Sequence, residues 1–296
     1  GIPHVATVHS LEPLRPWKAE QLGGGYAVSS FCERIGLEGA DAIVAVSAQH
    51  GSDILECYPA IDPARVHVIR NGIDTAEYAP DPGVDALKRL GIDPARPSVL
   101  FVGRITRQKG LTHLLDAALD IDPAAQLVLC ASSPDTPEIA AEIAVKLERV
   151  RATRGNVVWL SEMQPRRDVI QLLSHATVFV CPSVYEPLGI VNLEAMACET
   201  AVVATRVGGI PEVVDDAVTG LLVPFEPATD GGAKGALAPS DPVRFARDLA
   251  ARVNELLADP ARAERMGRAG RERVVEQFSW AAVATETVEL YEDLCR

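Results

Sequence analysis

Two basic side chains that could bind a phosphate follow an apolar segment near the middle of the chain. Arg104 and Lys109 lie in the run GRITRQKG, which begins at Gly103 at the end of the apolar residues 98–103. Residues 94–115 carry four Lys or Arg side chains and no acidic one, although the whole chain has a net charge of −13. Arginine binds phosphate oxygens in a bidentate way, and lysine supplies a point charge. The run therefore predicts a phosphate site, and a solvated surface loop is the alternative.

Two carboxylates, Glu186 and Glu194, are eight positions apart where an apolar segment gives way to a helical pattern in residues 182–196. Eight helical residues rise about 12 Å at 1.5 Å each, a separation that matches the two ends of a sugar nucleotide. The helix N-terminus between them offers free N–H groups to a phosphate, and Pro187 is typical of a first helical turn. The alternative is a Glu186 that only favours the helix dipole and a Glu194 on the surface.

Two further segments follow apolar strands. Gly208 and Gly209 come after residues 201–205 and allow a backbone to approach a ligand closely. A plain turn into a short helix near Pro211 is an equal alternative. His9 ends the first apolar segment, where it could face a cleft or serve the structure. The six histidines are dispersed and the six cysteines include no CxxC pair, so we expect no metal site.

Short apolar segments alternate with helical patterns along most of the chain, which predicts α/β layers with parallel sheets. The nine expected strands are residues 5–9, 42–47, 66–69, 98–103, 126–131, 157–160, 177–181, 201–205 and 220–223. The expected helices include residues 110–119, 137–153, 168–175, 188–198, 241–258, 260–277 and 280–294.

Residues 71–97 break this alternation with seven glycines and prolines, which indicates a linker with one short helix between two domains. We expect a partial N-terminal domain over residues 1–75 and a nucleotide-binding domain over residues 76–278. The first domain is short for a full partner, so we expect it to be truncated. Residues 224–239 have the composition of a loop and include three glycines close together: Gly231, Gly232 and Gly235.

The composition is that of a globular protein of 296 residues, with 48% hydrophobic and 23% charged residues. The excess of acidic residues argues against nucleic-acid binding. No apolar run reaches the length of about 18 residues that a membrane span requires, and no signal peptide is evident. Scattered single cysteines are typical of a reducing compartment, so we expect a cytoplasmic protein in which most cysteines pack in the core. A homo-oligomer is compatible with the sequence.

With these motifs in hand, the chain resembles the retaining GT-B glycosyltransferases, in particular the actinobacterial group of glycogen synthases and α-maltose-1-phosphate synthases. The motifs that carry the resemblance are GRITRQKG from Gly103, YEPLGIVNLEAMAC from Tyr185, GGIPE from Gly208, NGID from Asn71, and VHSLEPLRPWKAEQLGGGY from Val8. The resemblance implies two Rossmann-like domains. It also implies that the last helix, residues 279–296, returns to the N-terminal domain.

The resemblance also implies roles for individual residues. Arg104 and Lys109 would bind the donor diphosphate and stabilise the leaving nucleotide, while Glu186 would contact the hydroxyls of the donor sugar. Backbone N–H groups at the helix start would support the sugar and phosphate, Glu194 would hold the ribose, and His9 would face the sugar from the other domain. The implied catalytic residues are Arg104, Lys109, Glu186 and His9. The implied donor-binding residues are Gly103, Arg104, Lys109, Glu186, Leu188, Gly189 and Glu194.

The expected reaction transfers glucose, with retention of configuration, from ADP-glucose to an α-glucan end or to glucose 1-phosphate. It needs neither a metal nor a separate cofactor, because cations and a helix N-terminus stabilise the leaving diphosphate. Its partners are then the nucleotide sugar and the sugar acceptor. Two alternatives stay open: a sugar-nucleotide epimerase with His9 and Glu186 as acid and base, and a non-catalytic binder of nucleotide sugars.

Overall fold

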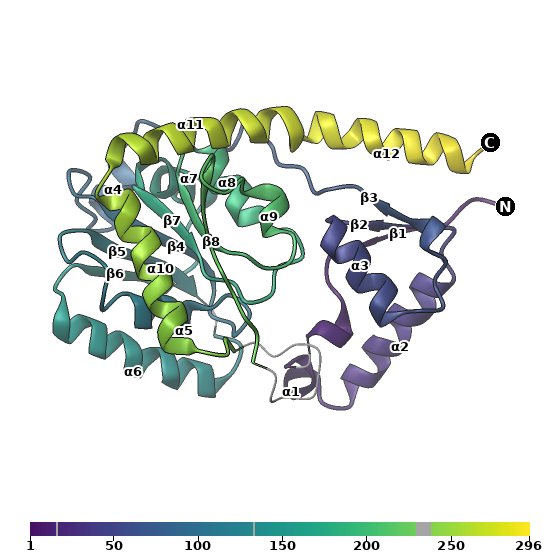
Figure 1. Ribbon diagram of the computed structural model, residues 1–296, viewed down its shortest axis with the longest axis horizontal. Helices are drawn as coiled ribbons and strands as arrows, with labels where there is room; N and C mark the ends of the chain where they lie inside the picture. The colour runs from purple at the N-terminus through teal and green to yellow at the C-terminus, as the bar shows by residue number, and fades with distance from the viewer. Residues whose placement is uncertain (16, 133, 229–237) are drawn as a thin grey trace.

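The computed structural model describes residues 1–15, 17–132, 134–228 and 238–296, and in this part the chain forms two parallel sheets (Figure 1). The smaller sheet has the order β1-β2-β3 and the larger one β6-β5-β4-β7-β8-β9. The strands are β1 (Val5–Val8), β2 (Ala42–Ala45), β3 (Val66–Val68), β4 (Ser98–Arg104), β5 (Gln126–Ser132), β6 (Val157–Leu160), β7 (Val178–Cys181), β8 (Val202–Thr205) and β9 (Gly220–Val223). All nine predicted strands are therefore confirmed, with ends that shift by at most two residues.

Helices connect the strands and cover both sheets. They are α1 (Lys18–Leu22), α2 (Gly25–Glu38), α3 (Ala48–Cys57), α4 (Asp85–Arg89), α5 (Leu111–Ala117), α6 (Pro137–Thr153), α7 (Arg166–His175), α8 (Ile190–Ala197), α9 (Ile210–Val213), α10 (Pro242–Leu257), α11 (Pro260–Gln277) and α12 (Trp280–Leu294). Three of them begin with a capping side chain followed by proline, the expected start of a helix: Thr136, Asp241 and Asp259 cap α6, α10 and α11.

The start of α8 differs from the sequence prediction. The helix was expected from residue 188 with Pro187 in its first turn, but it begins at Ile190. Gly189 has a φ of 99°, a left-handed conformation that a right-handed helix cannot contain. Pro187 therefore lies in the loop before the helix.

The core of the larger domain lies on both faces of its sheet, because successive strand side chains point to opposite faces. Val99 and Phe101 of β4 belong to the cluster that α5, α6 and α10 cover. Leu100, between them, belongs to the cluster on the opposite face, which α4, α7, α8 and α9 cover. Both faces are thus buried, which explains why the strands read as continuous apolar runs.

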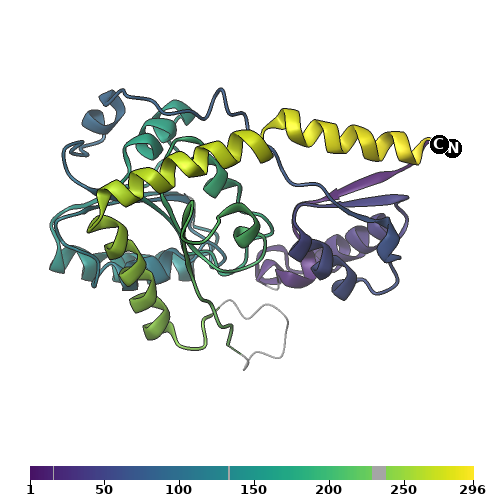
Figure 2. The ribbon, with the colours of Figure 1, turned by 45° about the horizontal axis from the view of Figure 1, so that its top comes forward.

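The C-terminal helix connects the two sheets. Phe278 at the end of α11 accepts a hydrogen bond from the Ile73 N–H at 2.8 Å, so the chain crosses the linker at this point. Helix α12 then continues along the molecule to the smaller sheet (Figure 2). There Val283 and Leu290 pack against Val44 and Ile69.

The structure also bears on the expected cysteine burial, membrane spans and glycine-rich loop. Cys130, Cys181 and Cys198 are buried as expected, whereas Cys32 on α2 and Cys295, directly after α12, are exposed. No helix in the described part of the chain is long and apolar enough to span a membrane. The expected glycine-rich loop at Gly231, Gly232 and Gly235 lies outside the described residues.

Candidate active site

The predicted site residues of the larger domain lie where the connections of its sheet change direction. From β4 the chain builds β5 and β6 on one side, then returns to place β7, β8 and β9 on the other. The loops after β4 and β7 therefore diverge at the carboxyl ends of these strands. The region between these two loops, called the crevice below, is the usual ligand position in such sheets. Lys109 lies in the first loop and Glu186 in the second.

Lys109 and Glu186 form an ion pair across this crevice. The Lys109 Nζ donates a hydrogen bond to the Glu186 Oε2 at 2.7 Å, and the Ser183 hydroxyl lies 3.3 Å from the same oxygen. Glu186 is only 7% exposed. Burial alone would lower the pKa of Lys109, but the nearby Glu186 carboxylate outweighs it and raises the pKa. Lys109 is therefore a cation at neutral pH, placed beside a buried carboxylate.

The neighbouring loops hold the backbone of Glu186 in place. The Gln108 carbonyl accepts a hydrogen bond from the Val184 N–H at 2.9 Å, and the Glu186 carbonyl accepts one from the Gly209 N–H at 3.0 Å. Gly208 has a φ of 52°, and a Cβ there would lie 2.0 Å from the Glu186 carbonyl oxygen. The glycine pair thus allows a close approach, but the group that lies against it is the backbone of the Glu186 loop and not a ligand.

The start of α8 leaves polar groups without partners. Within the described part of the chain, the N–H groups of Leu188 and Gly189 donate to no acceptor. Asn192, in the first turn of α8, is fully buried, and neither amide atom of its side chain has a hydrogen-bond partner among the described residues. Buried amides are almost always hydrogen-bonded, so this turn has unused capacity to bind an anion or a hydroxyl.

Arg104 and Gly103 lie beside the pair without joining it. Arg104 ends β4, and its side chain is 70% exposed, with its Nη1 3.5 Å from the Asp135 Oδ1. The charge of Arg104 lowers the pKa of Lys109, so the two cations are close enough to interact electrostatically. Gly103 precedes it in β4, where a Cβ would lie 3.9 Å from the Lys109 side chain.

Glu194 lies further along α8, away from the Lys109–Glu186 pair. Burial raises the pKa of Glu194 above its usual value, although a hydrogen bond from Tyr78 and the charges of Arg166 and Lys109 oppose this. Arg166 in turn pairs with both carboxylate oxygens of Glu77 at 2.8 Å. Sequence reasoning did not identify Tyr78 or Arg166, because neither lies near Glu194 in the chain.

The smaller domain contacts the same loops, although not through His9. Ser47, which follows β2, donates a hydrogen bond to the Pro187 carbonyl at 2.6 Å. No hydrogen bond or ion pair joins His9 to the larger domain within the described residues. Sequence reasoning missed Ser47, although its place at the end of a predicted strand, like that of His9, could have indicated it.

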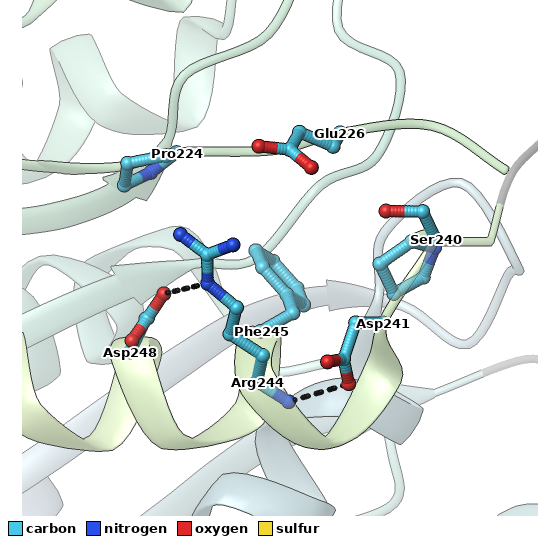
Figure 3. A pocket seen from close by; sticks show the side chains of 8 residues that line it. Pro224, Glu226, Ser240, Asp241, Arg244, Phe245 and Asp248 are labelled. Atoms are coloured by element: carbon cyan, nitrogen blue, oxygen red, sulfur yellow. Dashed lines mark hydrogen bonds and ion pairs between the residues drawn. The ribbon is translucent and has the colours of Figure 1, made fainter.

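Apart from a hollow of about 470 Å³ between Ile2 and Tyr291, two smaller hollows lie outside the crevice among the described residues. His9 and Glu33 line one of about 270 Å³ between β1 and α2. The other holds about 30 Å³, space for one or two water molecules, at the start of α10, where Arg244 lies 3.7 Å from Asp248 (Figure 3). Among the described residues, no group of three or more His, Cys, Asp or Glu side chains could hold a metal ion.

Known proteins share this architecture. Residues 85–236 match the family described as glycosyl transferases group 1, and residues 1–77 match glycosyltransferase family 4. The chain is 57% identical to the alpha-maltose-1-phosphate synthase of Mycolicibacterium smegmatis, over 98% of this chain and 73% of that protein. It is 32% identical to the glycogen synthase of Mycobacterium tuberculosis, over 98% of this chain and 63% of that protein.

A solved structure supports the same assignment. The sucrose-phosphate synthase of Thermosynechococcus elongatus superimposes with a TM-score of 0.77 and 32% identity, over 98% of this chain and 67% of that one. Two parallel α/β domains whose loops meet at one crevice, together with these matches, lead to one conclusion. The chain belongs to the group 1 glycosyltransferases and has the GT-B fold.

Proposed function

We propose that this chain is a retaining hexosyltransferase that moves glucose from ADP-glucose to glucose 1-phosphate and forms maltose 1-phosphate. The observation that carries the proposal is the Lys109–Glu186 pair at 2.7 Å in the crevice between β4 and β7. A cation and a carboxylate at one point can contact the diphosphate and the sugar of the same donor. The free N–H groups at the start of α8 lie beside them.

In the proposed reaction the bond between C1 of the donor sugar and the phosphate oxygen breaks. The acceptor oxygen forms its bond to C1 on the same face, and the acceptor proton passes to an oxygen of the leaving phosphate. Negative charge develops on the diphosphate, so Arg104 and Lys109 make the largest contribution to the rate. Glu186 holds hydroxyls of the donor sugar and acts neither as a nucleophile nor as a base.

The other groups of the site bind the remaining parts of the donor in this proposal. Glu194 holds the ribose, Gly103 leaves space beside Lys109, and the N–H groups of Leu188 and Gly189 contact the sugar and phosphate. His9 faces the sugar from the smaller domain when the donor is bound. Arg104 and Lys109 neutralise the diphosphate in place of a metal, and the nucleotide sugar is a substrate, so the proposed reaction uses no separate cofactor.

The choice of substrates is supported by the relatives. Identity to the α-maltose-1-phosphate synthase is 57%, against 32% to the glycogen synthase, and this difference favours glucose 1-phosphate over an α-glucan end as the acceptor. The donor ADP-glucose is proposed from the resemblance to this group.

A product assay tests the proposal. The chain is incubated with ADP-glucose and either glucose 1-phosphate or a short α-glucan, and the products are identified by proton and phosphorus NMR. We expect maltose 1-phosphate with an α linkage. Elongated glucan as the only product would make the α-glucan end the acceptor. In a parallel incubation with a UDP-sugar, formation of its C2 epimer would point to an epimerase. Donor binding without any transfer would make the chain a nucleotide-sugar binder.

A further inference from the structure

The first turn of α3 in the smaller domain contacts two loops of the larger one. Ser47 caps this helix by accepting a hydrogen bond from the His50 N–H at 3.0 Å. Its hydroxyl also donates to the carbonyl of Pro187, the residue after Glu186. Ser47 is fully buried, and a Cβ on Gly209 would lie 2.8 Å from its own Cβ. The two domains are thus in van der Waals contact at this point.

Glu212 of α9 forms the charged part of this contact. Its Oε1 accepts a hydrogen bond from the Gln49 N–H at 3.2 Å, in the same first turn of α3. Its Oε2 accepts two from the Arg70 guanidinium, at 2.8 and 3.2 Å. Both donors belong to the smaller domain. A carboxylate at a helix N-terminus that also pairs with arginine is a favourable arrangement, because both partners stabilise the anion.

The backbone of α9 connects this carboxylate to the active-site loop. Arg273 of α11 donates to the carbonyls of Glu212 and Val213 at 2.9 and 3.0 Å, which fixes the helix to the larger domain. The Glu212 N–H bonds to the Gly209 carbonyl, and the Gly209 N–H bonds to the Glu186 carbonyl, each at 3.0 Å. A displacement of α9 therefore moves the backbone of Glu186.

We propose that Glu212 is a positioning residue, which uses Arg70 and the first turn of α3 to hold Glu186 in the orientation needed for sugar transfer. The smaller domain thus helps to position the Glu186 carboxylate, although it does not contact the Glu186 side chain. Arg104, Lys109 and the start of α8 all lie in the larger domain, so binding of the nucleoside diphosphate does not depend on this contact.

Hydrogen exchange tests the physical link without reference to activity. Glu212→Gln keeps the size of the side chain and removes its charge, and Arg70→Ala removes the partner from the other domain. Both variants should increase amide exchange by about tenfold at Val184 and Gly209, whose N–H groups form the hydrogen bonds that hold the Glu186 loop. A matched control is the exposed pair of Glu148 and Arg151, 3.6 Å apart on α6, where Glu148→Gln and Arg151→Ala should change nothing at these two amides. Unchanged exchange in both test variants would overturn the proposal.

Kinetics test the consequence and rest on the proposed glycosyl transfer. In both test variants kcat should fall about ten- to a hundredfold, while the Kd for ADP stays within about twofold of the wild type. Exchange that rises without a loss of kcat, or a Kd for ADP that rises in parallel with the loss, would each overturn the positioning role. If the wild-type chain transfers no sugar, the proposed function fails, and the exchange result alone decides whether Glu212 holds the Glu186 loop.

Discussion

At the scale of single residues, the two cations of the site differ in their surroundings. Lys109 is already paired with a buried carboxylate, and its side chain is 27% exposed. Arg104 is mostly solvated, so it is free to turn toward a diphosphate. In the proposed function, Lys109 therefore has a structural and a catalytic role, whereas Arg104 has only a catalytic one.

Substitution of each cation should separate these contributions. Arg104→Ala should lower the rate of transfer by about 10²–10³, as for the loss of one donor to a developing anion, and leave the melting temperature unchanged. Lys109→Met should lower the rate and also destabilise the fold by about 3 kcal/mol, because it leaves the buried charge of Glu186 without an opposite charge. Rates from product assays and unfolding in urea provide the two measurements.

The double variant Lys109→Met with Glu186→Gln is the control for this interpretation. With the buried charge removed, most of the lost stability should return while the rate stays low. A double variant as unstable as Lys109→Met would show that the pair does not account for the stability, and full activity of Arg104→Ala would remove it from the catalytic residues.

The buried His50 predicts that the stability of the fold depends on pH. It is fully buried on α3, both ring nitrogens lack partners among the described residues, and burial, with a smaller effect of His9, lowers its pKa to about 4 from 6.5. A histidine with a depressed folded pKa contributes stability above pH 6.5 that is lost as the pH falls toward 4. The contribution at stake is about 3 kcal/mol.

Unfolding in urea at several pH values checks this. Between pH 7 and pH 4 the free energy of unfolding of the wild type should fall by about 3 kcal/mol more than that of His50→Leu, which cannot be protonated. Parallel curves for the two proteins would show that His50 does not titrate in this range.

At the scale of elements, the site depends on loops that follow neighbouring strands. The sequence allowed every strand to be located, because strands buried on both faces read as continuous apolar runs. It also identified Lys109 and Glu186 as separate candidates. It could not predict their contact, since they are 77 positions apart and only the sheet order brings β4 and β7 together.

The start of α8 shows a different limit of sequence reasoning. Pro187 is a common first helical residue, which favoured an earlier start than the one found. The left-handed Gly189 decides the boundary instead, and its φ depends on the contacts of the whole loop. Local propensity therefore located the helix but not its N-terminus, which is the part that faces the site.

The loop after β8 gives the element-scale prediction. Gly208→Ala should destabilise the fold by about 2–3 kcal/mol and weaken donor binding, because the new Cβ displaces the Glu186 carbonyl. Gly91→Ala is the matched control: Gly91 also has a positive φ, of 75°, but nothing lies within 4 Å of a Cβ there. We expect it to cost about 1 kcal/mol from backbone strain alone and to leave binding unchanged.

Urea unfolding and calorimetric titration of the two glycine variants provide the comparison. Equal losses of stability would mean that strain at φ, rather than contact with the Glu186 loop, explains the glycine at position 208.

At the scale of the whole molecule, α12 and the contacts of α3 hold two separate sheets together. The crossing near Ile73 and Phe278 returns the chain to the first domain, where α12 covers one face of β2. Such long-range contacts, like that of Glu212 with Arg70, leave no local pattern in the sequence. This is why sequence reasoning supplied the elements but not the residues that join the domains.

Substitutions on α12 should show how much this packing contributes. Leu290→Ala should destabilise the protein by about 2–4 kcal/mol, because Leu290 is 7% exposed against the smaller sheet. Val288→Ala on the same helix, where the side chain is 52% exposed, should stay within about 0.5 kcal/mol of the wild type. Thermal unfolding measures both, and equal effects would show that α12 does not stabilise the smaller domain.

Calorimetric titration tests whether a nucleotide-sugar donor binds in the crevice between β4 and β7. The chain is titrated with ADP-glucose, UDP-glucose and GDP-mannose, with Arg104→Ala as the comparison. We expect the tightest binding for ADP-glucose and a loss of about tenfold or more in affinity in the variant. Equal affinity of the variant and the wild type, or no binding of any donor, would contradict donor binding in this crevice.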